Sequence, residues 1–341
     1  MIKIIYIGSF LSKKVGSKDI IEKIKTDLER DSISIRLFSS FSNRFFRFVE
    51  ILLAIIFSKE RIVIFDVFSG KAFIITWIGS SLALVLNKKI VFILHGGALP
   101  DFTVRHMRLV TRVMKRAHYI QTPSQYLKEY FTNLGFSINY VPNPIELDRF
   151  PYKQPNTNER NLLWVRAFNH IYNPEIAVNI LFEIRKKYPD ARLTMIGPDK
   201  GELNITLSKI EKLNLGEAIQ ITGPIANENL SHYYQNHSVY INTTSYESFG
   251  LSLLEAASSG IPIVSIAVGE IPYMWTDHEN ILMLENLDPT AYAKLVYELW
   301  ENKDLALKLS SNARKKAETF AWELIKPQWI EMLKKVSGKE I

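Results

Sequence analysis

Short apolar runs rich in β-branched residues alternate with helix-like segments along the whole chain, and few folds accommodate such an alternation. The runs predict strands at 3–7, 34–38, 61–66, 89–94, 119–122, 139–141, 161–165, 192–197, 219–222, 239–242, 262–266 and 281–284. Several of them are apolar almost without interruption, as expected of strands that helices cover on both faces. The pattern therefore predicts two doubly wound α/β domains, each with a parallel sheet.

Helical patterns fill the intervals between the strands. In the first half they fall at 18–30, 42–57, 71–86, 104–116 and 123–134. The segment 152–160 is polar, contains a proline and lacks periodicity, so we expect a linker there and a hinge over 143–160. Ligands of such folds bind at the carboxyl ends of the strands, which predicts a site in the cleft between the domains.

Positive charge is concentrated in the first part of the chain. Residues 1–150 carry 22 basic and 12 acidic side chains, whereas residues 151–341 carry 20 and 23. The first part is therefore expected to meet an anionic partner. The absence of cysteine excludes disulfides and thiolate chemistry.

No export or membrane-spanning segment is expected. The apolar start of the chain is too short for a signal peptide, and no run reaches the roughly 18 apolar residues that a spanning helix needs. We therefore expect a cytoplasmic protein, peripheral to the inner face of a membrane if it binds one.

Two stretches combine arginines with apolar residues. Arg105, Arg108, Arg112 and Arg116 follow a helical spacing, and 44–48 reads Arg-Phe-Phe-Arg-Phe at the start of an apolar helix. Both are compatible with an anionic membrane surface. A solvated face and a buried helix are the alternatives, and no motif for reading nucleic acid is present.

The segment 242–264 carries the most informative pattern. A polar loop follows the strand 239–242 and ends at Gly250, a helix then runs to about Ser259, and Gly260 marks its end. Unpaired N–H groups in the first turn of such a helix, together with the helix dipole, favour an anion. The backbone of Ser248, Phe249, Gly250 and Leu251 is therefore the expected anion site.

Two glutamates frame this site. Glu247 lies at its mouth, and Glu255, eight residues later, is expected about two turns into the helix. A diphosphate at the helix start would place its sugar near Glu247 and its ribose near Glu255. Read alone, the pair could equally be a solvated loop glutamate and a helix-surface glutamate.

The segment resembles the E-x7-E region of the retaining glycosyltransferases of family four, the group 1 family with the GT-B fold. Four further stretches are similar to motifs of that family, namely 141–150 at the domain junction, 196–198, 269–272 and 320–322. The resemblance implies an acceptor-side domain at 1–150 with a crossover helix at about 323–341, and a nucleotide-sugar domain at 151–322.

The resemblance also implies an activity. It is transfer of a hexose from a nucleotide-diphosphate sugar to an acceptor hydroxyl, with retention of configuration, in the synthesis of bacterial surface polysaccharide or lipid-linked glycan. No Asp-x-Asp pair, the metal-binding signature of the other large glycosyltransferase fold, occurs in the chain. We therefore expect metal-independent catalysis, with the donor as the only small-molecule partner besides the acceptor and no cofactor.

Three residues are carried over as catalytic. Arg166 follows the strand 161–165, where the family has an arginine that contacts the donor phosphates. His95 follows the strand 89–94, where the family often has a histidine near the transferred sugar, and Glu247 would hold the sugar hydroxyls. The donor-binding set implied by the family is Gly16, Gly197, Ser248, Phe249, Gly250, Leu251 and Glu255.

One position departs from the family pattern. Ile171 stands where the family has a lysine, which removes a positive charge from the phosphate site; His170 and Lys200 are alternative cations. This departure leaves a non-catalytic sugar-nucleotide-binding or scaffolding protein as an alternative, together with a sugar-nucleotide epimerase of the same fold. Motifs of dinucleotide oxidoreductases, P-loop proteins, zinc proteases and serine hydrolases are missing.

Overall fold

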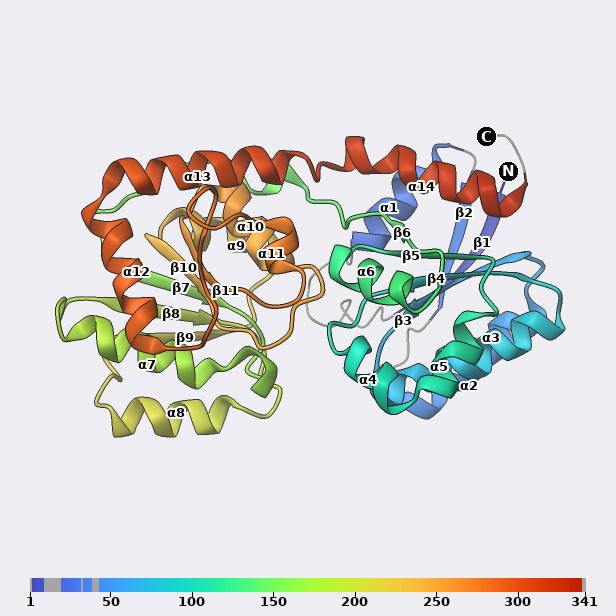
Figure 1. The fold of residues 1–341 in the computed structure, drawn as a ribbon, viewed down its shortest axis with the longest axis horizontal. Coiled ribbons are helices and arrows are strands. Elements are labelled where there is room, and N and C mark those ends of the chain that lie inside the picture. Colours follow the sequence, from blue (N-terminus) through green and yellow to red (C-terminus); the bar gives the residue numbers. More distant parts are fainter. Residues whose placement is uncertain (1, 9–19, 32, 39–42, 339–341) are drawn as a thin grey trace. The chain divides into compact units, whose positions relative to one another are not determined.

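The structure, a computed structural model, describes residues 2–8, 20–31, 33–38 and 43–338 (Figure 1). The chain divides into two compact units, one of Met1–Pro144 with Glu323–Ile341 and one of Ile145–Trp322. Each unit contains one six-stranded sheet. The polar segment 152–160 lies within the second unit, where the N–H of Lys153 donates to the carbonyl of Ser259 at 3.1 Å.

The first unit has the strand order β2-β1-β3-β4-β5-β6, with all pairs parallel. Its strands are β1 (Ile2–Ile7), β2 (Ile33–Phe38), β3 (Ile62–Val67), β4 (Lys89–Leu94), β5 (Tyr119–Thr122) and β6 (Asn139–Tyr140). Its helices are α1 (Ile20–Glu29), α2 (Arg44–Phe57), α3 (Phe73–Val85), α4 (Leu99–Arg105), α5 (Met107–Met114), α6 (Gln125–Asn133) and α14 (Trp322–Ser337).

The handedness of the crossovers sorts these helices. The strand β2 lies on one side of β1, and β3 to β6 lie on the other side. The connection from β1 to β2 therefore crosses the sheet in the opposite direction to the later connections. Right-handed crossovers then place α1 on one face of the sheet and α2 to α5 on the other. Figure 1 shows α1 and α14 on one side of this sheet and α2 to α5 on the opposite side.

The helix predicted over 104–116 is wrong. The chain instead forms α4 and α5, which meet at His106. Pro100 lies in the first turn of α4, a position that suits a residue without an N–H, so the helix starts earlier than the apolar period suggested. Arg105 therefore belongs to α4 and Arg116 lies beyond α5, so the four arginines do not form one continuous helical face.

The second unit has the strand order β12-β11-β10-β7-β8-β9, again with parallel pairs. Its strands are β7 (Asn161–Val165), β8 (Arg192–Ile196), β9 (Ile219–Gly223), β10 (Val239–Asn242), β11 (Ile263–Ile266) and β12 (Leu282–Leu284). Its helices are α7 (Pro174–Arg185), α8 (Leu203–Lys212), α9 (Asn227–Gln235), α10 (Leu251–Ser259), α11 (Ile271–Met274), α12 (Pro289–Glu301) and α13 (Lys303–Glu318).

Large buried side chains of the second unit fix the loop that leaves β10. The indole N–H of Trp164 donates to Thr243 Oγ1 at 3.0 Å, and the hydroxyl of Tyr292 donates to the carbonyl of Asn242 at 2.7 Å. Both aromatic side chains are fully buried. The end of β10 is therefore anchored from two directions by the core.

All twelve predicted strands are confirmed, with ends that differ by at most one residue, and both sheets are parallel as expected. In the part of the chain that the structure describes, no helix is both long and apolar enough to cross a bilayer.

Candidate functional site

The topological switch point of the second sheet lies between β7 and β10. The chain proceeds from β7 outward to β8 and β9, and then returns to place β10 on the other side of β7. Loops that follow two such strands leave the sheet in opposite directions and open a crevice at its carboxyl edge. Arg166 directly follows β7, and Asn242 is the last residue of β10.

The structure brings Arg166 to the loop that follows β10. Its Nη2 lies 2.6 Å from Glu247 Oε2, and its Nε and Nη2 donate to Asn242 Oδ1 at 3.3 and 3.2 Å. The guanidinium carbon lies 5.2 Å from the centre of the Tyr172 ring. Both members of the ion pair are only 11% exposed, so water screens their interaction far less than at an open surface.

Some N–H donors of Arg166 have no partner among the described residues. A guanidinium has five N–H donors, and Nε and Nη2 account for three of them. Within the described residues, Nη1 has no hydrogen bond. Burial alone lowers the pKa of Arg166, but Glu247 and nearby tyrosines outweigh it and raise that pKa above its usual value. The side chain is thus a fixed cation with two N–H groups left for an anion.

Glu247 also engages the turn that precedes α10. Its Oε1 accepts hydrogen bonds from the N–H groups of Ser248 at 3.1 Å and Phe249 at 3.3 Å. Gly250 follows with a φ of 90°, in the left-handed region that favours glycine. The N–H groups of Ser248 and Phe249 are therefore occupied in this structure, while those of Gly250 and Leu251 have no hydrogen bond among the described residues.

Two glycines allow backbone to approach this site closely. A Cβ on Gly197 would lie 1.9 Å from the carbonyl oxygen of Arg166, and one on Gly269 would lie 2.0 Å from that of Glu247. Gly197 therefore has a packing reason to be glycine that requires no ligand. Gly269 lets the turn after β11 support the Glu247 backbone, whose carbonyl accepts from the N–H of Glu270 at 3.0 Å.

Glu255 lies closer to the start of α10 than predicted. It is the fifth residue of the helix, little more than one turn in, because Glu247 to Gly250 are loop rather than helix. Its Oε2 accepts the hydroxyl of Tyr234 at 3.0 Å. Burial raises the pKa of Glu255 to about 7, against the opposing effects of that hydrogen bond and of the charges on Arg166 and Arg149.

The raised pKa of Glu255 predicts a pH-dependent stability. The folded chain keeps the Glu255 proton where the unfolded chain has lost it, so the free energy of unfolding should fall as the pH rises from 4.5 to 7. Glu255→Gln should remove this decline. Between pH 5 and pH 8, the free energy of unfolding of the variant should therefore rise by on the order of 2 kcal/mol relative to that of wild type. Urea unfolding at pH 5 and at pH 8 measures this difference. Glu211→Gln, a substitution at an exposed position, is the control. An identical pH dependence in wild type and Glu255→Gln would contradict the assignment.

Sequence reasoning missed two residues of this cluster, Asn242 and Tyr172. Asn242 orients Arg166, is itself fully buried, and donates from Nδ2 to Ser265 Oγ at 2.9 Å. A polar residue at the end of the apolar run Val-Tyr-Ile-Asn was the available signal. Tyr172 carried no comparable signal, because its contact with Arg166 joins segments that are separate in the pattern of strands. Gly269 lies in the stretch 269–272 that resembles a family motif, but its close contact with Glu247 was not predicted.

The position of the missing lysine lies against the same loop. The carbonyl of Ile171 accepts the N–H of Ser245 at 2.7 Å, and its own N–H donates to Asn169 Oδ1 at 3.1 Å. The alternative cations His170 and Lys200 are both exposed. Neither has a described contact with Arg166 or Glu247, so compensation by them stays a prediction.

Two predicted residues do not belong to the second unit. His95 belongs to the first unit, where its Nε2 lies 3.0 Å from Asp66 Oδ1 and its ring stacks on Phe68 with 5.6 Å between ring centres. Asp66 also accepts the hydroxyl of Tyr6 at 2.6 Å. His95 thus has a fixed orientation at the carboxyl edge of that sheet. Gly16 lies outside the described residues.

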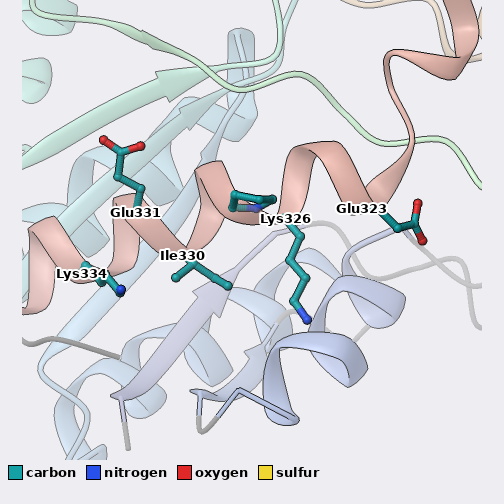
Figure 2. Close-up of a pocket in the computed structure, with 6 residues that line it drawn as sticks. Glu323, Lys326, Ile330, Glu331 and Lys334 are labelled. Carbon is teal, nitrogen blue, oxygen red and sulfur yellow. The ribbon is translucent and has the colours of Figure 1, made fainter.

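A groove of about 400 Å³ lies along α14 of the first unit (Figure 2). Its described lining comes from that helix alone and includes Glu323, Lys326 and Ile330. Lys326 is paired with Asp31 at 2.6 Å. None of the predicted site residues lines this groove, and we assign it no role.

Solved structures share this fold over nearly the whole chain. The structure of sucrose-phosphate synthase from Thermosynechococcus elongatus matches 99% of this chain and 100% of its own, with a TM-score of 0.84 at 16% identity. HepE from Anabaena, in complex with UDP and glucose, matches 98% of this chain and 99% of its own, with a TM-score of 0.75 at 16% identity. The chain therefore has the GT-B fold, as expected.

The sequence identifies the family. Residues 147–316 match the sequence model of the glycosyl transferases group 1. Through its second unit, which contains the Arg166 cluster, the chain belongs to the group 1 glycosyltransferase family.

Curated relatives match over part of their length. D-inositol 3-phosphate glycosyltransferase from Streptomyces coelicolor is 26% identical over 158 residues, which are 44% of this chain and 35% of that protein. The protein of the same description from Corynebacterium urealyticum is 25% identical over 175 residues, which are 50% of this chain and 41% of that protein. The chain thus matches about a third to two fifths of the length of these relatives.

Proposed function

We propose that this chain is a retaining, metal-independent glycosyltransferase that moves a hexose from a nucleotide-diphosphate sugar to an acceptor hydroxyl. The observation that carries the proposal is the pairing of Arg166 with Glu247 at the switch point, beside the start of α10. It supplies a buried cation with free N–H donors and a carboxylate next to it. These are the groups that a leaving diphosphate and the hydroxyls of its sugar require.

The proposed reaction exchanges one bond at the anomeric carbon. The bond from this carbon to the diphosphate oxygen breaks, and the acceptor oxygen bonds on the same face. The acceptor proton leaves with the diphosphate. Arg166 Nη1 and the N–H groups of Gly250 and Leu251 stabilise the charge that develops on the leaving group, which is the main catalytic effect.

The other predicted residues complete the proposal. Glu247 binds the sugar hydroxyls, Glu255 binds the ribose, and His95 of the first unit contacts the transferred sugar. We propose a UDP-hexose as donor, because HepE was solved with UDP-glucose and with UDP and glucose. The proposed acceptor is a bacterial surface polysaccharide or a lipid-linked glycan, with the protein on the inner face of the membrane.

A donor panel tests this function. The protein is incubated with UDP-glucose, UDP-galactose, UDP-N-acetylglucosamine and GDP-mannose, and nucleotide release and sugar products are measured. Slow donor hydrolysis without acceptor, and faster nucleotide release with one, are expected. Tight binding without release indicates the non-catalytic alternative, and a changed donor sugar without acceptor indicates an epimerase.

Ile171 allows a gain-of-function test of the phosphate site. Its backbone is already fixed by Ser245 and Asn169, so Ile171→Lys should add a cation without moving the loop. We expect the KM for the donor to fall about fivefold, since a cation near a diphosphate contributes on the order of 1 kcal/mol at a partly exposed site. Ile205→Lys, the same substitution at an exposed position on α8, is the matched control. Turnover only in Ile171→Lys would favour the non-catalytic alternative for the natural chain, and weaker donor binding by Ile171→Lys would contradict the phosphate site.

A further inference from the structure

Two helices of the first unit expose an unusual share of apolar side chains. Half of the exposed large hydrophobic side chains in the described residues lie on α2, on α3 or directly after α3. Phe57 at the end of α2 is 77% exposed, and Val85 at the end of α3 is 78% exposed. We define the α2–α3 surface by six of these residues: Phe45, Leu53, Phe57, Ile74, Trp77 and Val85.

The apolar residues of α2 form one stripe. Phe45, Leu53 and Phe57 share one face at helical spacing, and all three are exposed. The opposite face carries Ile51 and Ile55, which are buried in the core of the unit. α2 therefore has an apolar face against the sheet and a second one that the described residues leave uncovered.

The helix α3 also exposes large apolar side chains. Its buried residues are Phe73, Thr76, Gly79, Ser80 and Ala83, whereas Ile74 and Trp77 are exposed. Gly79 lies so close to the sheet that a Cβ would approach the Phe65 ring to 2.7 Å. A surface helix of a globular protein usually keeps its large apolar residues inside. α3 buries Phe73 but leaves Ile74 and Trp77 exposed, so it carries apolar side chains on both faces.

Basic residues are enriched in the part of the chain that forms this surface. Residues 44–116 contain twelve lysines and arginines and four acidic residues. Of the four, Glu60 is buried, and Asp66 bonds Tyr6 and His95. The α3 helix packs beside α2 and α5 (Figure 1), and Arg116, just after α5, donates to the carbonyl of Trp77 at 2.8 Å. The basic residues that flank the two helices, Arg44, Lys59, Lys71 and Lys89, are exposed, whereas Lys88 is buried. With Arg112 and Arg116 they form the basic rim of the α2–α3 surface.

We propose that the α2–α3 surface docks the protein on an anionic phospholipid bilayer, with the apolar side chains in the interface and the basic rim on the lipid phosphates. The thirteen residues of α3 extend about 20 Å, too short to span a bilayer core of about 30 Å. Apolar insertion and attraction to anionic lipid are the two contributions that together hold an interfacial helix. Symmetric pairing with a second copy would bring two positive rims together, so charge favours the lipid.

Vesicle co-sedimentation tests the proposal without donor or acceptor, so its outcome is separate from that of the sugar-transfer test. The full chain should bind vesicles of 70% phosphatidylcholine and 30% phosphatidylglycerol, and bind pure phosphatidylcholine much more weakly. Phe57→Ser and Val85→Ser should each lower the partition coefficient about tenfold, and Arg112→Glu about fivefold or more. Ile205→Ser, Leu207→Ser and Lys212→Glu, at exposed positions on α8 of the second unit, should leave it unchanged.

Trp77 supplies a reporter of the docking geometry. The chain has six tryptophans; Trp77 is 40% exposed and each of the other five is at most 7% exposed. Vesicles that contain brominated lipid should therefore quench part of the emission, and Trp77→Phe should abolish this quenching while vesicle binding persists.

Three results would overturn the proposal. One is absence of binding to the anionic vesicles, and another is binding that Phe57→Ser and Val85→Ser leave unchanged. The third is concentration-dependent dimerisation that the same two variants abolish, measured by light scattering without lipid. The last result would assign the α2–α3 surface to a second copy of the chain.

Discussion

Replacing Arg166 with alanine is expected to lower kcat/KM for sugar transfer by about a hundredfold to a thousandfold. The variant loses the cation and the two Nη1 donors that we propose for the leaving diphosphate, and a preorganised donor at a developing charge is worth that much. Glu247 keeps its hydrogen bonds from Ser248 and Phe249, so the loop should stay folded. Nucleotide release in the presence of acceptor measures the effect.

The control lies at the other end of the same strand. Arg160 precedes β7 and pairs with the exposed Asp190 at 3.2 Å, so Arg160→Ala should leave transfer within about twofold. Arg166→Lys should give an intermediate rate, because lysine keeps the charge but not the planar fork that bonds Asn242 and Glu247 together. A fully active Arg166→Ala would remove the basis of the proposed mechanism.

The second large effect is expected at Gly197. An alanine Cβ would lie 1.9 Å from the Arg166 carbonyl oxygen, and a backbone atom cannot yield as the end of a side chain can. We expect Gly197→Ala to lower the free energy of unfolding by about 3 kcal/mol or more. Because β7 and β8 must separate at this point, Arg166 should also be displaced and the KM for the donor should rise. Urea unfolding and donor titration at low temperature measure both changes.

Gly201 is the matched control for this substitution. It lies in the same loop with a φ of 110°, but a Cβ there would meet nothing within 4 Å. Gly201→Ala should therefore cost only about 1–2 kcal/mol, the cost of placing an L-residue in this backbone conformation. Equal losses of stability in Gly197→Ala and Gly201→Ala would show that close contact with Arg166 is not the reason for glycine at 197.

The strands could be predicted from sequence because the property that defines them is local. A buried parallel strand is an apolar run of a few residues, and the four runs at 89–94, 119–122, 161–165 and 239–242 match the structure at both ends. The prediction of a single helix at 104–116 was wrong. The start of α4 depends on Pro100, and the division into α4 and α5 depends on the bend at His106, neither of which the spacing of apolar residues reveals.

The site could be predicted only in outline. The order of strands places Arg166 and Asn242 at one sheet edge, but it does not show that Arg166 bonds a glutamate 81 residues later. Counting eight residues from Glu247 also misplaced Glu255, since half of that interval is loop. The outward apolar face of α3 was equally hidden, because an apolar helix reads the same in sequence whichever side is buried.

Calorimetric titration of UDP and of UMP, in a buffer that contains a chelator, tests most directly whether the Arg166 cluster binds the diphosphate. Wild type is expected to bind UDP at least tenfold more tightly than UMP, and Arg166→Ala is expected to bind the two about equally. If Arg166→Ala retains the full preference for UDP, the diphosphate is bound elsewhere and Arg166 does not have the proposed role.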